Sequence, residues 1–233
     1  MAAAYTDVDG AESNFDYAKQ VNGKAVGQIA DICAKRSIPL VFLSTDYVFD
    51  GTTNRPWQPN DKTDPLNAYG KSKLLGEKAI LSSGAEAAIL RTSWVFDGLG
   101  KNFLTTMLDL SKTRSQLTVV SDQVGRPTYA GHLALACIKT LETLILNPSK
   151  SGVYHVTNSG EPISWADFSR AIFRVSEIDI KIVDILSEHY PRPAPRPANS
   201  VLDIRAFEAT FGYKLPSWQK GLDAALRERQ VMS

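Results

Sequence analysis

Residues 40–51 read LVFLSTDYVFDG, four apolar residues followed at once by Ser44, Thr45 and Asp46. Pro39 precedes the apolar run, and Gly51 follows the polar stretch. A short continuous apolar run between breakers is typical of a strand buried on both faces of a parallel sheet. The stretch therefore predicts a strand that ends in polar side chains, where ligands bind in open α/β sheets.

Segments with helical and strand patterns alternate on both sides of this run. Helical spacing of apolar residues predicts helices over 22–36, 67–82, 103–111, 131–146, 164–175 and 207–230, the last with a turn near 212–216. Further strands are predicted over 87–92, 117–120, 153–156 and 180–185. Four prolines make 191–197 an extended segment. Repeated alternation of helix and strand indicates an α/β protein with a mostly parallel sheet.

Composition narrows the class of protein. The 233 residues include 26 Lys and Arg against 25 Asp and Glu, a net charge of +1 that offers no field for steering to nucleic acid or an anionic membrane. An apolar share of 43% excludes a disordered chain, and no apolar run is long enough to span a membrane. With no secretory signal at the start and only Cys33 and Cys137, the sequence predicts a cytoplasmic protein.

Tyr69 and Lys73 form the sharpest chemical pattern. They lie four residues apart on the predicted helix 67–82 and so share one face. An ammonium beside a phenol lowers its pKa from about 10, which would let Tyr69 exchange a proton near neutral pH. Ser44 and Thr45 place hydroxyls at a strand end, where one could hydrogen-bond the same reacting oxygen. The alternative is a surface Tyr and Lys at chance spacing.

Together these residues resemble the extended short-chain dehydrogenases/reductases, and more closely the dTDP-4-dehydrorhamnose reductase family. The similarity covers nearly the whole chain. It is carried by AAAYT (2–6), STDYVFDG (44–51), PLNAYGKSK (65–73), LRTSWV (90–95), DQVGRPT (122–128), RPANSVLD (196–203) and LPSW (215–218). The segments 44–51 and 196–200 are far more specific than a Tyr-x-x-x-Lys pair.

The resemblance implies a Rossmann-like doubly wound parallel sheet. Residues 1–150 would form the remainder of the NAD(P)-binding domain, and 151–233 a small α/β substrate-binding lobe, with the two lobes interleaved. Family members begin with a strand and a GxxGxxG turn that holds the cofactor pyrophosphate. This sequence has no such motif. We therefore expect an amino-terminally shortened fold that lacks about 60 residues, or two βαβ units, and leaves a sheet edge exposed.

The resemblance also implies an NADPH-dependent reduction of dTDP-4-dehydro-L-rhamnose, with NADH as the alternative reductant. Tyr69 would protonate the C4 oxygen, Thr45 would hydrogen-bond it, and Lys73 would lower the pKa of Tyr69 and hold the nicotinamide ribose. Cofactor contacts are expected from Ala2, Ala3, Ala4, Tyr69 and Lys73, and dTDP-sugar contacts from Thr6, Asp46, Trp94, Arg196 and Asn199.

Other functions stay open at this point. A non-catalytic relative, such as the regulatory β subunit of methionine adenosyltransferase, would bind a partner enzyme. A nucleotide-sugar epimerase or dehydratase would use the same Tyr and Lys with tightly held NAD⁺. Asp7, Asp9 and Glu12 offer oxygen ligands for Mg²⁺, although such a cluster is more often a solvated helix start. No structural metal is predicted, and a homodimer is an open expectation.

Overall fold

The computed structural model describes residues 1–232 and contains a central three-stranded parallel sheet. The strands are β1 (Leu40–Thr45), β2 (Ala87–Thr92) and β7 (Gly152–His155), in the order β1-β2-β7. Their register sets Thr45 opposite Thr92. The polar carboxyl ends of β1 and β2 thus lie side by side, as the sequence predicts.

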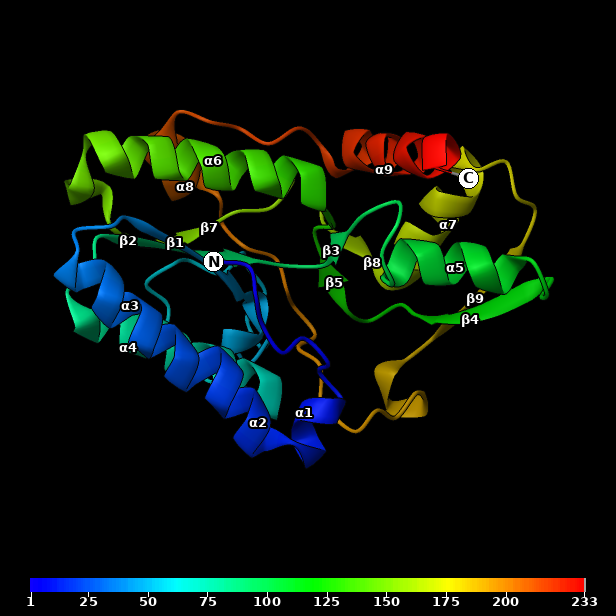
Figure 1. The fold of residues 1–233 in the computed structure, drawn as a ribbon. Coiled ribbons are helices and arrows are strands. Elements are labelled where there is room, and N and C mark those ends of the chain that lie inside the picture. Colours follow the sequence, from blue (N-terminus) through cyan, green and yellow to red (C-terminus); the bar gives the residue numbers. More distant parts are fainter. Residues whose placement is uncertain (233) are drawn as a thin grey trace.

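Helices cover both faces of this sheet (Figure 1). One face carries α3 (Ala25–Lys35) and α4 (Ala68–Ser83), and the other carries α6 (Ala130–Leu146) and α8 (Arg205–Phe211). Alternate residues of β1 serve the two cores, because neighbouring side chains in a strand point to opposite faces. Phe42 packs with the α3 side, and Val41 with the α6 and α8 side. This arrangement confirms the Rossmann-like class.

A second group of elements packs beside the sheet around its own core (Figure 1). Strand β4 (Gln116–Val120) pairs in parallel with β9 (Lys181–Ile185). Three helices surround the pair: α5 (Phe103–Ser111), α7 (Trp165–Val175) and α9 (Trp218–Met232). Short pairs join β3 (Val95–Phe96) to β6 (Thr128–Tyr129) and β5 (Val124–Gly125) to β8 (Ile163–Ser164). The chain therefore passes between the two groups several times.

The first residues run along the outer edge of β1. The Met1 amino group donates to the Val41 carbonyl, and the Leu43 N–H donates to the Met1 carbonyl at 3.3 Å, which is the parallel pattern. The chain then forms α1 (Gly10–Ser13), α2 (Phe15–Lys19) and a π-helical turn (Gln20–Lys24) that continues into α3. The predicted helix start at residue 22 was wrong, because the helical path begins at Phe15.

Local capping explains the boundaries that sequence did predict. Asn67 caps α4 by accepting from the Gly70 N–H, and Gly84 ends that helix with a φ of 73°, a conformation that favours glycine. Ser164 caps α7 by accepting from the Asp167 N–H. Single 3₁₀ turns occupy Asp46–Val48, Pro148–Lys150 and Ser187–His189. Within residues 1–232, no helix has the length and apolar character needed to cross a membrane.

Candidate active site

Thr45, Tyr47 and Tyr69 meet just beyond the end of β1. The buried Thr45 hydroxyl donates to Oδ1 of Asp46 at 3.0 Å and accepts from the Tyr47 N–H at 3.2 Å. The rings of Tyr47 and Tyr69 pack edge to face, with centroids 5.9 Å apart. Two residues predicted from separate segments, Thr45 and Tyr69, thus share one site, and the Thr45 hydroxyl is near enough to the Tyr69 phenol to influence its pKa.

Lys73 lies one helical turn after Tyr69, on α4, and is buried. Its Nζ donates to the Leu43 carbonyl at 2.7 Å and lies 4.1 Å from the centre of the Phe42 ring. Burial lowers the pKa of Lys73 to about 8, although the carboxylate of Glu77 opposes this. The ammonium therefore titrates much closer to neutral pH than that of an ordinary lysine.

The expected effect of Lys73 on Tyr69 was wrong for this structure. Burial raises the pKa of the Tyr69 phenol, and the nearby Asp46 carboxylate adds to the rise, while the Thr45 hydroxyl partly opposes it. Lys73 makes no matching contribution because its ammonium is directed at the Leu43 carbonyl. Tyr69 is accordingly held in its protonated form, which suits a proton donor.

Ser44 turns away from Tyr69, since it points to the opposite side of β1 from Thr45. Its hydroxyl donates to Oε1 of Glu77 at 2.5 Å. Glu77 also binds the guanidinium of Arg91, with Nη2 at 2.7 Å and Nε at 3.0 Å from its two oxygens, and both side chains are almost fully buried. Sequence analysis missed Glu77 and Arg91. One signal existed, because Glu77 continues the four-residue spacing of Tyr69 and Lys73.

The amino-terminal segment passes the same end of β1 (Figure 1). Ala2, Ala3 and Thr6 are exposed. Asn22 holds the segment through Tyr5, with the Tyr5 N–H bound to Oδ1 and the Tyr5 carbonyl bound to Nδ2, both at 2.9 Å. Such small side chains leave the backbone open to a flat ligand, so the site fits the nicotinamide end of a dinucleotide.

Two partly exposed ion pairs connect this segment to the proline-rich stretch. Oδ1 of Asp9 binds Arg196 and Oδ2 binds Arg192, each at 2.5 Å. Burial alone would raise the pKa of Asp9, but hydrogen bonds from Arg196, the Ala194 N–H and Arg192 outweigh it and lower the pKa to about 2. Both arginines reach a cavity of about 290 Å³. It is lined by Tyr47, Phe103, Met107, Thr118, Val119, Val120, Gln123, Trp165, Tyr190, Arg192 and Arg196.

Trp94 lies at the edge of this region. Its backbone has a φ of 51°, and its ring stacks on Trp165, which lines the cavity, with centroids 3.5 Å apart. Gly125 packs under the Trp94 ring, where an added Cβ would come within 2.6 Å of it. The stack fixes the orientation of Trp165 and makes Trp94 a support for the cavity wall.

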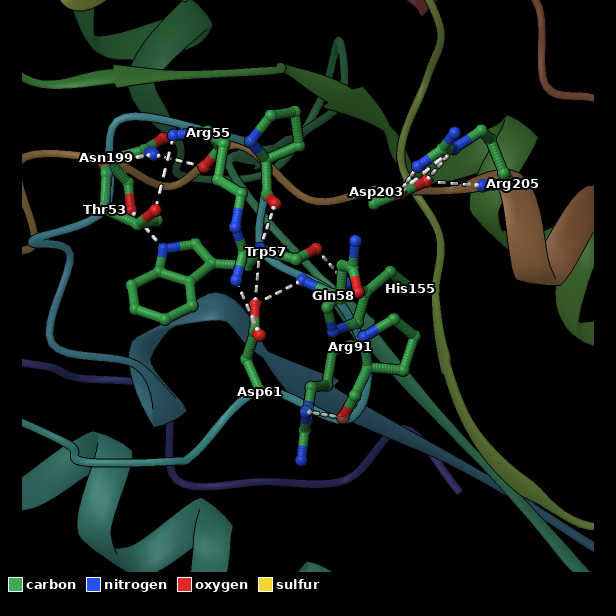
Figure 2. A network of polar contacts seen from close by, with 12 residues as sticks. Thr53, Arg55, Trp57, Gln58, Asp61, Arg91, His155, Asn199, Asp203 and Arg205 are labelled. Atoms are coloured by element: carbon green, nitrogen blue, oxygen red, sulfur yellow. Dashed lines mark hydrogen bonds and ion pairs between the residues drawn. The ribbon is translucent and has the colours of Figure 1, made fainter.

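Asn199 belongs to a separate polar network (Figure 2). Its Nδ2 donates to the carbonyls of Thr53 and Arg55 at 2.8 and 2.9 Å, and its Oδ1 accepts from the Val201 N–H. All of these partners are backbone groups, so the side chain holds two loops together. The structure therefore does not bring Asn199 together with Thr45 and Tyr69 in one hydrogen-bonded group.

The three acidic residues near the amino terminus have separate partners. Asp7 accepts from the Gly10 N–H, Glu12 accepts from the Ala68 N–H at the start of α4, and Asp9 binds the two arginines. Among residues 1–232 there is no group of three or more His, Cys, Asp or Glu that could hold a metal ion. In this arrangement Asp7 bonds within its own turn, while Asp9 and Glu12 connect the amino-terminal segment to distant parts of the chain.

Comparison with known proteins agrees with the geometry. Residues 1–231 match a family profile described as the RmlD substrate binding domain. The chain is 44% identical to a dTDP-4-dehydrorhamnose reductase of Burkholderia thailandensis, over 97% of this chain and 80% of that protein. A crystal structure of the Bacillus anthracis dTDP-4-dehydrorhamnose reductase in complex with NADP superposes with a TM-score of 0.91, at 34% identity, over 97% of this chain and 78% of that one.

A second solved structure, the dTDP-4-dehydrorhamnose reductase of Clostridium acetobutylicum, is equally similar in fold. Its TM-score is also 0.91, with 38% identity over 98% of this chain and 79% of that chain. The matches cover almost every residue of the chain, including β1, α4 and the proline-rich stretch that form the site. On this evidence the chain belongs to the dTDP-4-dehydrorhamnose reductase family.

Proposed function

We propose that this protein is an NADPH-dependent reductase that converts dTDP-4-dehydro-L-rhamnose to dTDP-L-rhamnose. One observation carries the proposal: the Thr45 hydroxyl, the Tyr69 phenol and the Lys73 ammonium gather at the carboxyl end of β1. They do so in a chain 44% identical to an enzyme with that name. Reduction of a ketone requires a proton donor. The end of a parallel strand is where ligands bind in open α/β sheets, so a donor there can reach a bound substrate.

The residues would divide the work as follows. When bound, NADPH supplies the hydride that reduces the C4 carbonyl carbon. Tyr69 would donate its proton to the C4 oxygen, and its raised pKa holds the proton on the phenol until hydride transfer makes that oxygen strongly basic. The Thr45 hydroxyl would turn its hydrogen from Oδ1 of Asp46 to the same oxygen and orient it, while it still accepts from the Tyr47 N–H. Lys73 holds the nicotinamide ribose through its ammonium.

The cofactor and the sugar nucleotide would lie on opposite sides of Tyr69. Ala2, Ala3 and Ala4 let the dinucleotide approach the backbone, beside Tyr69 and Lys73. The cavity lined by Tyr47, Trp165 and the two arginines suits a dTDP-sugar, because a planar base can stack on aromatic rings and a diphosphate accepts forked hydrogen bonds from guanidinium groups. Thr6, Asp46, Trp94, Arg196 and Asn199 are proposed on the substrate side.

The test is a direct assay of the purified protein with NADPH in excess. Oxidation of NADPH is followed at 340 nm with enzymatically prepared dTDP-4-dehydro-L-rhamnose, and the product is identified by mass spectrometry. Turnover in the wild type and its loss in Tyr69→Phe would support the proposal. Absence of turnover, or purification with firmly bound NAD⁺ and epimerase activity on a nucleotide sugar, would overturn it.

We also propose a cytoplasmic location and a homodimeric state for the enzyme. Both cysteines, Cys33 and Cys137, are free, which suits a reducing cytoplasm. Apolar side chains on one flank of α6, Ile138, Leu141 and Ile145, are exposed at 52%, 38% and 61%. A continuous apolar flank of this kind suits a homodimer contact. Light scattering at micromolar concentration tests it, and a monomer of Ile138→Glu beside a dimer of Leu81→Glu, which alters an exposed leucine of α4, would identify the flank.

A further inference from the structure

A buried ion pair between Glu77 and Arg91 lies beneath the proposed catalytic residues, and the mechanism above does not use it. Glu77 follows Lys73 by four residues on α4, so the two side chains lie on one face of that helix. The exposed fraction of the residue is 1% for Glu77 and 4% for Arg91. Their double contact satisfies both carboxylate oxygens. Burying a charge pair at this depth costs desolvation free energy, and a function of the pair would account for that cost.

Each partner of the pair is anchored by a second element. The Ser44 hydroxyl of β1 donates to Oε1 of Glu77, and Nη1 of Arg91 donates to the Pro59 carbonyl at 3.0 Å. The carboxylate therefore cannot swing toward Lys73 and form a direct ion pair. It acts on the ammonium through space, while the Leu43 carbonyl receives the ammonium hydrogen bond. The two functions, charge and direction, come from different groups.

We propose that Glu77, held by Arg91 and Ser44, is a positioning residue whose fixed negative charge stabilises the buried Lys73 ammonium, while the Leu43 carbonyl directs it. A buried ammonium loses much of its hydration, which favours the neutral amine. The other charged groups nearby are the Met1 amino group, which disfavours a second positive charge, and Arg91, whose charge is directed at Glu77. Glu77 is the group that opposes deprotonation.

Binding Ser44 has a second consequence at the end of β1. Ser44 and Thr45 are adjacent hydroxyls, and a slip of one position would exchange them. Since the Ser44 hydroxyl is engaged by Glu77, Thr45 is the hydroxyl presented to Tyr69. The ion pair thus fixes two of the three groups of the proposed reductase site, and the inference rests on that proposed function for its catalytic meaning.

The experiment measures the titration of Lys73 itself. Protein with ¹³C-labelled lysine is titrated by NMR, and the Lys73 ¹³Cε signal is assigned with Lys73→Met. Two variants are compared with the wild type. The first is Glu77→Gln. The second combines Ser44→Ala, Glu77→Met and Arg91→Met, which removes the whole buried group. Arg55→Met with Asp61→Asn, which removes a bidentate pair from the network of Figure 2, is the matched control.

We expect the pKa of Lys73 to fall by about one unit, a tenfold loss of proton affinity, in both Glu77 variants and to stay unchanged in the control. Glu77→Asp should retain the wild-type titration because it keeps the charge. In active protein the alkaline limb of kcat should move down by the same amount. An unshifted Lys73 titration in folded Glu77→Gln, or in the folded triple variant, would overturn the proposal.

Failure of both Glu77 variants to fold, with Glu77→Asp folded, would assign the pair to stability alone and would also overturn it. The NMR titration uses neither cofactor nor substrate. Its outcome is therefore independent of whether the protein reduces a dTDP-sugar, and a failure of the proposed function would be seen separately in the turnover assay.

Discussion

The Asn22 side chain binds both backbone polar groups of Tyr5, since its Oδ1 accepts from the Tyr5 N–H and its Nδ2 donates to the Tyr5 carbonyl, at 2.9 Å each. The same amide nitrogen lies 2.9 Å from the Ser72 hydroxyl of α4. One side chain, set in a π-helical turn, therefore joins the amino-terminal segment to the helix that carries Tyr69 and Lys73. Single π turns occur frequently at functional sites, and here the turn places Asn22 between the two halves of the proposed cofactor site.

Asn22→Ala should destabilise the protein and loosen the amino-terminal segment. The substitution removes the hydrogen bonds to the partly buried backbone of Tyr5 and to the buried Ser72 hydroxyl, which costs about 1–3 kcal/mol. Urea unfolding measures the loss. Asn14→Ala is the control, since its hydrogen bonds are exposed and its effect should stay within about 0.5 kcal/mol. Equal stability of the two variants would remove Asn22 as an anchor.

Tyr69→Phe should abolish turnover while leaving the affinity for NADPH nearly unchanged. The phenol proton is needed only in the transition state, so the loss falls on kcat, by at least about 10²-fold. Steady-state kinetics and a fluorescence titration with NADPH separate the two quantities. Tyr154→Phe, which removes a phenol bonded to the Lys150 carbonyl, should keep its kcat. A Tyr69→Phe enzyme with near-normal kcat would exclude Tyr69 from proton transfer.

Lys73→Met should weaken cofactor binding and change the pH profile of the enzyme. Because the pKa of Lys73 is about 8, wild-type activity that needs the ammonium should decline as pH rises above that value. The variant should lack this alkaline step and show a higher Kd for NADPH at pH 7. Lys71→Met alters an exposed lysine two residues away and should change neither property. An unchanged profile and Kd in Lys73→Met would refute the assigned role.

The parts of the site that could be predicted from sequence are those set by local geometry. Thr45 follows an apolar run, and Tyr69 and Lys73 share a helix face, so periodicity alone brings each to its place. The parts that could not be predicted depend on partners distant in sequence. The Ser44 hydroxyl donates to Glu77, and the Asn199 side chain donates to the carbonyls of Thr53 and Arg55.

The direction of the Tyr69 pKa shift shows the same limit. Spacing suggested that Lys73 would lower it, but the result depends on how deeply the phenol is buried and on where the ammonium is directed. Both are properties of packing between β1 and α4, which a helical repeat does not encode. The π turn was also missed, because no residue type in Gln20–Lys24 marks the place where the hydrogen-bond pattern changes to i→i+5.

Asp46→Asn should stabilise the protein increasingly as pH rises. Burial raises the pKa of Asp46 to about 7, against an ordinary value of 3.8, and Oδ2 has no hydrogen-bond partner among residues 1–232. Between about pH 4 and 7 the folded carboxyl keeps a proton that the unfolded chain releases, so its contribution to stability is lost across that window. Urea unfolding at pH 5 and pH 8 should show the variant gaining at least about 1 kcal/mol relative to wild type.

The matched control for Asp46→Asn is Asp16→Asn, which alters an exposed carboxylate and should gain nothing between the two pH values. If Asp46 also contacts the sugar, the stabilised variant should pay with a raised KM, the usual exchange between stability and function at a site. A variant whose stability relative to wild type is the same at both pH values would show that Asp46 is not held protonated.

The 233-residue polypeptide on its own should bind NADPH weakly. Pyrophosphate affinity in this fold comes from a Gly-rich turn and the amino end of the following helix, and no GxxGxxG occurs in these residues. In the proposed site, Ala2, Ala3, Ala4, Tyr69 and Lys73 would reach only the nicotinamide end. Calorimetric titration of this polypeptide, with the Burkholderia thailandensis relative as the reference, should give a Kd at least about tenfold higher, a difference of about 1.4 kcal/mol. An equal Kd in the low micromolar range would contradict the argument and would mean that another segment, or a second subunit, supplies the phosphate contacts.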